Sequence, residues 1–228
     1  MSSDHYTPPV NPLPPVVVAL VLFIMGVELT FILGAKGLVG GPAAVGWRLS
    51  AIETYGFYPS ILDWMIETGR WSFGNVIRFV TYPFVSTSFT HAIFVCVFVL
   101  AMGKMVAEVF GGFPMLIIFV LSGIGGALVY AILLDPRYPL IGGFPSVYGL
   151  IGAFTWLLWR KLSLVGENQV RAFNLIAMLM AIQLLFGLIF GGTPDWVADL
   201  GGFATGFGLS FILAPGSWER IVGRIRRD

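Results

Sequence analysis

The stretch G-G-F-P-S-V-Y-G-L-I-G, from Gly142 to Gly152, joins a glycine-rich loop to an apolar helix. Proline suits the first turn of a helix, where its missing N–H has no helical partner, so Pro145 predicts a helix start at this point. Gly149 and Gly152 are three residues apart and give the helix a thin face that another helix can approach closely. The stretch therefore predicts a tight loop followed by a helix that packs through its glycines.

The apolar run that begins here is short for a membrane span. It covers 145–159, and at 1.5 Å per residue it extends about 22 Å, less than the roughly 30 Å of a hydrocarbon core. The helix is therefore expected to begin inside the membrane. Because non-helical backbone at that depth must be buried in protein or line a water-filled cavity, 142–144 are expected at the floor of a hollow.

The composition points to a membrane protein. With 57% hydrophobic and 11% charged residues among 228, the chain is predicted to be an all-α, polytopic membrane protein. The net charge of +1 argues against a nucleic-acid partner.

Cys96 has no second cysteine to pair with and is interpreted as a buried, inert thiol. The two histidines, His5 and His91, lack the H-E-x-x-H pattern, so neither a metal site nor a cofactor is expected.

Six spanning helices form the predicted bundle, which extends over 16–214. They are expected at 16–33, 89–109, 113–134, 145–159, 172–190 and 198–214. Between the first two spans, 34–88 combine aromatic, charged, glycine and proline residues, which favours one large loop of short helices in the headgroup region. A proline-rich lead over 1–15 lacks the positive charge of a secretory signal peptide, and a basic tail occupies 215–228.

The lysines and arginines of the loops indicate the orientation. With the N-terminus in the cytoplasm, eight basic residues lie inside and five outside, most of the five in one long loop that counts less under the positive-inside rule. The protein is therefore expected in a bacterial inner membrane with both termini in the cytoplasm. The hollow at 142–144 is then expected to open to the outer side.

Three of the polar residues inside the predicted spans are candidates for a specific role. Glu28 is a candidate functional carboxylate because ionisable groups are rare inside membranes, but it lies near a helix end, and the favoured interpretation is that it reaches the interface. Asn174 and Gln183 lie in the fifth span, where they can hydrogen-bond either to a partner helix or within the protein.

Three segments carry a resemblance to a known family. They are R-F-V-T-Y-P-F-V-S-T-S-F-T-H over Arg78–His91, the stretch Gly142–Gly152, and A-D-L-G-G-F-A-T-G over Ala198–Gly206. In order and spacing they resemble the entry to the second helix, the active-site turn and the base-bearing helix of the rhomboid intramembrane serine proteases. Glu108, Gly111 and Gly112 are the counterparts of a glutamate and glycines that follow the second helix in that family. The resemblance implies a six-helix bundle with a large first loop.

The residues that carry catalysis in that family are replaced here. By the resemblance, Phe144 stands at the position of the nucleophilic serine and Pro145 at that of the following glycine. Asp199 stands at the position of the base histidine, Val95 at that of the oxyanion asparagine, and Ser86 at that of an earlier histidine. These five are the degenerate active-site positions, and no catalytic residue is assigned.

Other family features are retained. His91 keeps the second histidine of the second helix, and Tyr148 keeps the tyrosine that packs on the catalytic histidine in the family. The retained small residues are expected to allow close helix contact, because no hydrophobic force joins helices in lipid. They are Gly149 and Gly152 on the fourth helix, with Gly202 and Gly206 on the sixth.

The replacements predict that the family reaction is lost. Serine catalysis needs a hydroxyl, a nearby base and oriented donors for the oxyanion, and phenylalanine supplies no nucleophile. Ser146 is a hydroxyl two residues further on, but two residues of helix correspond to about 200° of rotation, so it is expected to point away. Asp195 is expected in the loop, so that it does not form an acid pair with Asp199 in one cavity.

Roles other than catalysis are expected for two of the degenerate positions. Asp199 suits the start of a helix, where its carboxylate would cap the backbone and meet the positive end of the dipole. It is also expected to accept a hydrogen bond from Tyr148. Phe144 is expected to fill the space of a lost active site.

The favoured function is a non-catalytic, rhomboid-like membrane protein that binds transmembrane segments of client or partner proteins. By resemblance, a client helix would enter between the second and fifth helices. The alternative is a fixed accessory subunit or assembly factor of a larger membrane complex. A third hypothesis keeps intramembrane proteolysis through unorthodox residues. The expected partners are transmembrane proteins and the lipid bilayer.

Overall fold

The structure is a computed structural model that describes residues 12–134 and 139–215. Its described residues form helices and turns, and their β-structure is an isolated bridge in which Phe57 and Leu140 exchange backbone hydrogen bonds of 3.0 and 2.8 Å. The all-α prediction is therefore confirmed. The described residues do not include His5, most of the proline-rich segment over 1–15, or the tail from residue 216.

Five helices are long and apolar enough to cross a membrane, among the described residues. They are α1 (Pro15–Ala35), the second span over Phe89–Phe110, α8 (Gly112–Leu133), the span over Gln169–Ile189, and α11 (Trp196–Leu213). The span over Gln169–Ile189 begins with a 3₁₀ turn (Gln169–Phe173) and continues as α10 (Asn174–Phe190). The chain thus contains the apolar helices of a polytopic membrane protein.

The second span changes its winding partway along. It begins as α6 (Phe89–Phe98), passes through a π-helical segment (Val99–Gly103) and ends as α7 (Lys104–Phe110). Ser88 precedes α6, and its hydroxyl accepts a 3.2 Å hydrogen bond from the His91 N–H, which caps the helix. Cys96 is buried in α6, in agreement with its interpretation as a buried thiol.

The fourth predicted helix of the bundle, over 145–159, is longer than predicted. α9 extends over Phe144–Leu164, which is 21 residues and about 31 Å. Residues 160–164 lack a continuous apolar character, but arginine, lysine and leucine are good helix formers, so the helix outlasts the apolar run. The Arg160 guanidinium lies 5.4 Å from the Trp156 ring. The predicted bounds of this helix are therefore too short, but its apolar part is still 145–159, and its start inside the membrane stays a prediction.

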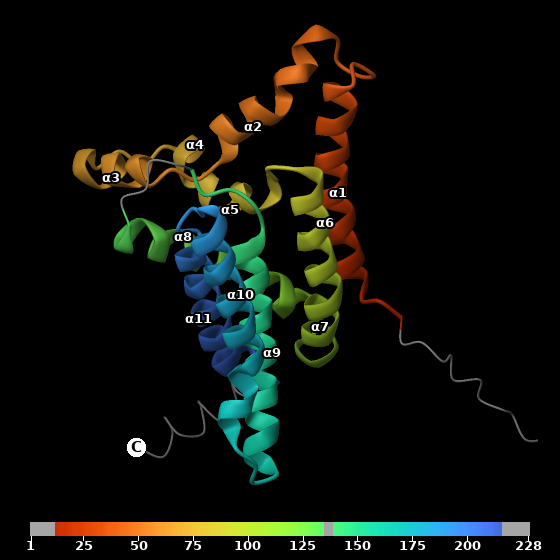
Figure 1. The fold of residues 1–228 in the computed structure, drawn as a ribbon, viewed down its shortest axis with the longest axis vertical. Coiled ribbons are helices and arrows are strands. Elements are labelled where there is room, and N and C mark those ends of the chain that lie inside the picture. Colours follow the sequence, from red (N-terminus) through yellow and green to blue (C-terminus); the bar gives the residue numbers. More distant parts are fainter. Residues whose placement is uncertain (1–11, 135–138, 216–228) are drawn as a thin grey trace, which may run out of the picture.

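Short helices fill the segment between α1 and α6. They are a 3₁₀ turn (Pro42–Gly46), α2 (Trp47–Tyr55), α3 (Pro59–Thr68), α4 (Phe73–Val76), α5 (Arg78–Thr81) and a second 3₁₀ turn (Tyr82–Phe84). They lie at one end of the bundle, and the end of α9 lies at the other (Figure 1). We call the first of these the loop end. Trp71 and Phe73 are exposed there, as expected of residues in a headgroup region.

Close backbone contact joins α9 to α11 in the centre of the bundle. A β-carbon added to Gly206 would overlap the backbone of Gly149, and one added to Gly202 would overlap the carbonyl of Pro145. In the same way, a β-carbon on Gly152 would overlap the carbonyl of Phe203. The four glycines identified in the sequence thus line one helix contact, which fixes α9 and the residues at its start.

Candidate functional site

The loop before α9 is pressed against the start of α6. Gly142 has a φ of +94°, and a β-carbon there would overlap the imidazole of His91. The Gly142 N–H donates a 3.0 Å hydrogen bond to the carbonyl of Tyr82. Only glycine combines this backbone conformation with so close an approach to a ring, so the loop is specifically shaped to cover His91.

Phe144 begins α9 directly beside His91. The two ring centroids are 4.8 Å apart, and the ring planes are inclined at 38°. The Phe144 side chain is half-buried. A hydrocarbon ring therefore contacts the imidazole at the position where the resemblance places a nucleophilic hydroxyl.

Val95 lies one turn after His91 on α6 and contacts the same loop. It is fully buried, and a β-carbon added to Gly143 would lie 2.7 Å from its Cγ1 and 3.1 Å from the carbonyl oxygen of Pro83. Its isopropyl group therefore packs against the loop that would cradle an oxyanion. A hydrocarbon at this point offers no hydrogen bond to developing negative charge.

Asp199 is held by a residue that the sequence did not pair with it. The side chain is buried, and its Oδ2 accepts a 2.8 Å hydrogen bond from Nε2 of Gln183 on α10. The Tyr148 hydroxyl donates to Oε1 of the same Gln183 at 3.1 Å. The predicted direct bond from Tyr148 to Asp199 is therefore wrong. The side chain of aspartate is shorter than that of histidine, and the amide of Gln183 bridges the remaining space.

The predicted capping role of Asp199 is also wrong. α11 begins at Trp196, with Asp195 as the residue before it, so Asp199 lies inside the first turn. Asp195 accepts hydrogen bonds from the hydroxyls of Tyr130 at 3.3 Å and Thr193 at 2.5 Å. The two carboxylates therefore have separate partners, which agrees with the expectation that they do not act as an acid pair.

Ser146 faces away from these residues. It is fully buried, and a β-carbon added to Gly123 on α8 would lie 2.6 Å from its Oγ. The hydroxyl has no hydrogen-bond partner among the described residues. No catalytic arrangement of a hydroxyl, a base and an acid is formed, because no hydrogen bond in the described part of the chain joins Ser146, His91 or Asp199 to one another. The three side chains have different neighbours.

Glu28 does not reach the interface, so the favoured interpretation of this residue is wrong. Its side chain is only 1% exposed, and both carboxylate oxygens accept hydrogen bonds from Arg48 of α2, at 2.9 and 2.5 Å. Arg48 Nη1 also donates to the carbonyl of Ser86 at 2.7 Å, and its guanidinium lies 5.2 Å from the Phe31 ring. A two-pronged guanidinium can satisfy a carboxylate inside the protein, so Glu28 has no need of water.

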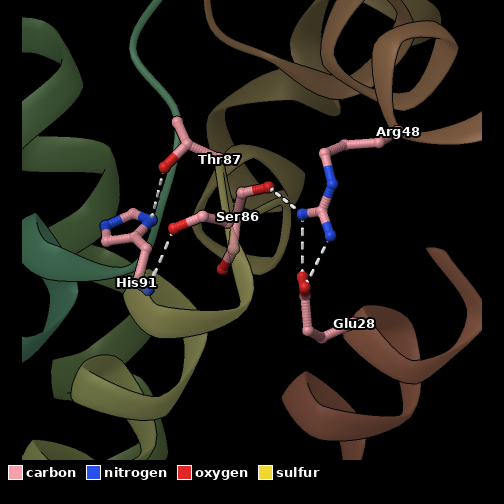
Figure 2. Close-up of polar contacts among 6 residues, drawn as sticks. Glu28, Arg48, Ser86, Thr87 and His91 are labelled. Atoms are coloured by element: carbon pink, nitrogen blue, oxygen red, sulfur yellow. Dashed lines mark hydrogen bonds and ion pairs between the residues drawn. The ribbon is translucent and has the colours of Figure 1, made fainter. Parts of the chain in front are cut away.

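Figure 2 shows how this ion pair reaches the candidate site. The Arg48 guanidinium lies between Glu28 and the backbone of Ser86, and Thr87 follows directly in the chain. The Thr87 hydroxyl lies 3.3 Å from Nδ1 of His91. The segment that leads into α6 is therefore fixed from both sides, by α1 and α2 on one and by His91 on the other.

Gln183→Leu is expected to lower the free energy of unfolding by about 1–3 kcal/mol, because it leaves the buried Asp199 carboxylate and the Tyr148 hydroxyl without their shared partner. Asn174→Leu is the matched control, since Asn174 is exposed on the same helix. Thermal unfolding in detergent measures both changes. Equal melting temperatures for the two variants would show that the bridge contributes nothing.

Comparison with known proteins supports the motif pattern. A family model described as the Rhomboid domain matches residues 74–216 of the 228. Rhomboid-like protease 3 of Toxoplasma gondii is 31% identical over 135 residues, which are 58% of this chain and 49% of that protein. RHOMBOID-like protein 4 of Arabidopsis thaliana is 25% identical over 150 residues, which are 66% of this chain and 34% of that protein.

A third relative gives the same result. RHOMBOID-like protein 6, mitochondrial, of Arabidopsis thaliana is 27% identical over 162 residues, 68% of this chain and 46% of that protein. This chain therefore spans about a third to a half of the length of these curated relatives. The family match covers the helices and loop that form the candidate site, and the chain belongs to the rhomboid family.

Proposed function

We propose that this chain is a rhomboid pseudoprotease, which binds transmembrane segments of client or partner membrane proteins and does not cleave them. The observation that carries the proposal is the contact of the Phe144 ring with His91, 4.8 Å between centroids, at the start of α9. The fold around this point is that of the family, but the group that would attack a peptide bond is a hydrocarbon.

The neighbouring residues support the same conclusion. Acyl transfer needs a nucleophile activated by a base and donors aimed at the oxyanion. Val95 presents methyl groups to the loop, and Asp199 is engaged by Gln183. Ser146 faces Gly123 of α8. Restoring proteolysis would require movement of several elements at once, and not the rotation of one side chain.

The outer face of α10 supports binding to another membrane protein. Leu184, Leu185, Leu188 and Ile189 are exposed along this helix, and Leu188 is 85% exposed. Beside them lies a pocket of about 770 Å³ between the end of α10 and the start of α11. Lipid covers a smooth apolar face as well as protein does, but a pocket next to that face gives a projecting side chain of a client helix a place to insert.

The proposal includes an orientation. Both termini lie in the cytoplasm of a bacterial cell and the loop end faces outward from the inner membrane, as supported by the eight inner and five outer basic residues. Clients would therefore be bound near the outer ends of their transmembrane helices.

Photocrosslinking in native membranes tests this binding. A photoreactive residue at position 188 is expected to give adducts with other membrane proteins, because Leu188 lines the pocket. The matched control is position 132, since Ile132 is 76% exposed on α8 but lies outside the pocket. Peptide identification of the adducts names the partners.

The outcomes separate the possible roles. Several membrane proteins crosslinked at 188 and not at 132 would support a client-binding protein. A single partner in a stoichiometric band on a native gel would instead indicate a fixed subunit of a complex. Equal yields at both positions, or adducts with lipid alone, would contradict the proposal.

A further inference from the structure

The pocket beside α10 lies at the loop end of the bundle, where α10 turns into α11. It has a volume of about 770 Å³. Its wall includes the last turns of α10, the connecting loop and the first residue of α11. The residues that matter for its chemistry are Gln183, Leu188, Thr193, Asp195 and Trp196.

The charge that lines this pocket is negative. Asp195 contributes a half-buried carboxylate, and no lysine or arginine is found among the described residues that line the pocket. Behind Gln183 lies a second carboxylate, because the Gln183 amide that borders the pocket donates to Asp199. One carboxylate thus lines the pocket, a second lies behind Gln183, and the described lining residues include no cation, which makes the pocket complementary to a hydrogen-bond donor or a positive charge.

Asp199 has an unused acceptor. The residue is only 2% exposed, and its Oδ1 has no hydrogen-bond partner in the described part of the chain. A buried carboxylate oxygen without a donor is costly, and a single neutral amide satisfies only the other oxygen. A stronger donor that reached this carboxylate would therefore be bound favourably.

Resting on the function proposed above, we propose that the pocket selects clients whose transmembrane helix carries a donor-bearing side chain, an amide or a cation, in the half nearest the loop end. The donor replaces the Gln183 amide on Asp199, and the Gln183 side chain turns away from the carboxylate. The rest of the client helix lies against Leu184, Leu185 and Leu188.

The depth of Gln183 favours a client helix over a lipid headgroup as the source of the donor. Gln183 lies seven residues before Phe190, the last residue of α10, which places it about 10 Å along the helix from that end. A headgroup ammonium stays at the interface, whereas a side chain on a spanning helix is held at this depth by its backbone. A donor here is also poorly solvated by lipid, so it gains most from a protein acceptor.

The test uses the full chain in phosphatidylcholine vesicles and three single-span peptides. The peptides are identical except at one position in the half nearest the loop end, which is leucine, glutamine or lysine, and binding is measured by energy transfer between dyes. The glutamine and lysine peptides are expected to bind about tenfold more tightly than the leucine peptide, a difference of about 1.4 kcal/mol.

Three variants identify the acceptor. Asp199→Leu is expected to abolish both preferences, and Asp199→Asn, which keeps the shape and an acceptor for Gln183, is expected to remove most of the lysine preference. Glu167→Gln is the control for loss of one negative charge, because Glu167 is exposed in the loop before α10, away from the pocket. It is expected to leave all three affinities unchanged.

The outcomes distinguish this inference from the function on which it rests. Equal, measurable binding of all three peptides would overturn donor selection and leave client binding standing. A preference that survived in both Asp199 variants, or that disappeared when phosphatidylethanolamine was added to the vesicles, would also overturn it. Binding of no peptide above the level of protein-free vesicles would contradict both proposals together.

Discussion

Gly206→Ala is expected to lower the free energy of unfolding by about 3 kcal/mol, at the upper end of the range for an overpacked core. The added β-carbon would overlap the carbonyl oxygen, the carbonyl carbon and the α-carbon of Gly149. All three are backbone atoms, so no side chain can rotate away, and α9 and α11 must separate. Since this contact positions the start of α9, the loop over His91 is expected to loosen as well.

Gly208→Ala provides a control on the same helix. A β-carbon at Gly208 would meet no atom within 4 Å, so the change affects only helix propensity. It is expected to be neutral or to stabilise α11 by up to about 1 kcal/mol. Unfolding of the two variants in mixed detergent micelles compares them directly. A Gly206 variant as stable as the Gly208 variant would show that the helices do not meet as described.

Arg48→Leu is expected to destabilise the protein by about 3–5 kcal/mol, because it leaves Glu28 buried without its counter-charge. The carbonyl of Ser86 loses its donor at the same time. Replacing both charges in Glu28→Leu/Arg48→Leu is expected to restore most of this loss, since a buried ion pair and a hydrophobic pair of similar size are often nearly equal in stability.

Arg171→Leu is the comparison for an exposed ion pair. Arg171 and Glu167 lie 3.1 Å apart with side chains 67% and 54% exposed, so the loss is expected to stay within about 1 kcal/mol. Equal effects of Arg48→Leu and Arg171→Leu would contradict the buried pair. Failure of the double variant to recover stability would show that Arg48 acts mainly through Ser86.

The spanning helices could be predicted from the sequence because the property that places a helix in a membrane is local. A long apolar run marks α1, α8 and α11 without reference to any other part of the chain. The end of α9 could not be found in this way, because its last residues are helical but polar. Hydrophobicity predicts the part of a helix that lies in lipid, and helix propensity decides how far it continues.

The site could be predicted only in part. The motifs identified Phe144, Val95 and Asp199 because spacing along the chain is preserved within a family. The two polar bridges could not be predicted, because they join residues far apart in the sequence. Arg48 is 20 residues from Glu28 and 38 from Ser86, and Gln183 is 35 residues from Tyr148. Such pairings depend on how the helices pack, although a glutamate and a glutamine inside apolar runs mark where partners must be found.

The central proposal is that this chain binds a transmembrane segment and leaves it intact. Its most direct test is intact-mass spectrometry of a single-span test protein after incubation with the purified chain in vesicles. The chain carries the photoreactive residue at position 188. We expect adducts of the full-length test protein and no cleavage fragment, with the same result for the Ser146→Ala variant. A fragment cut within the span, formed by this chain and lost when Ser146→Ala or Asp199→Ala is added, would contradict the proposal.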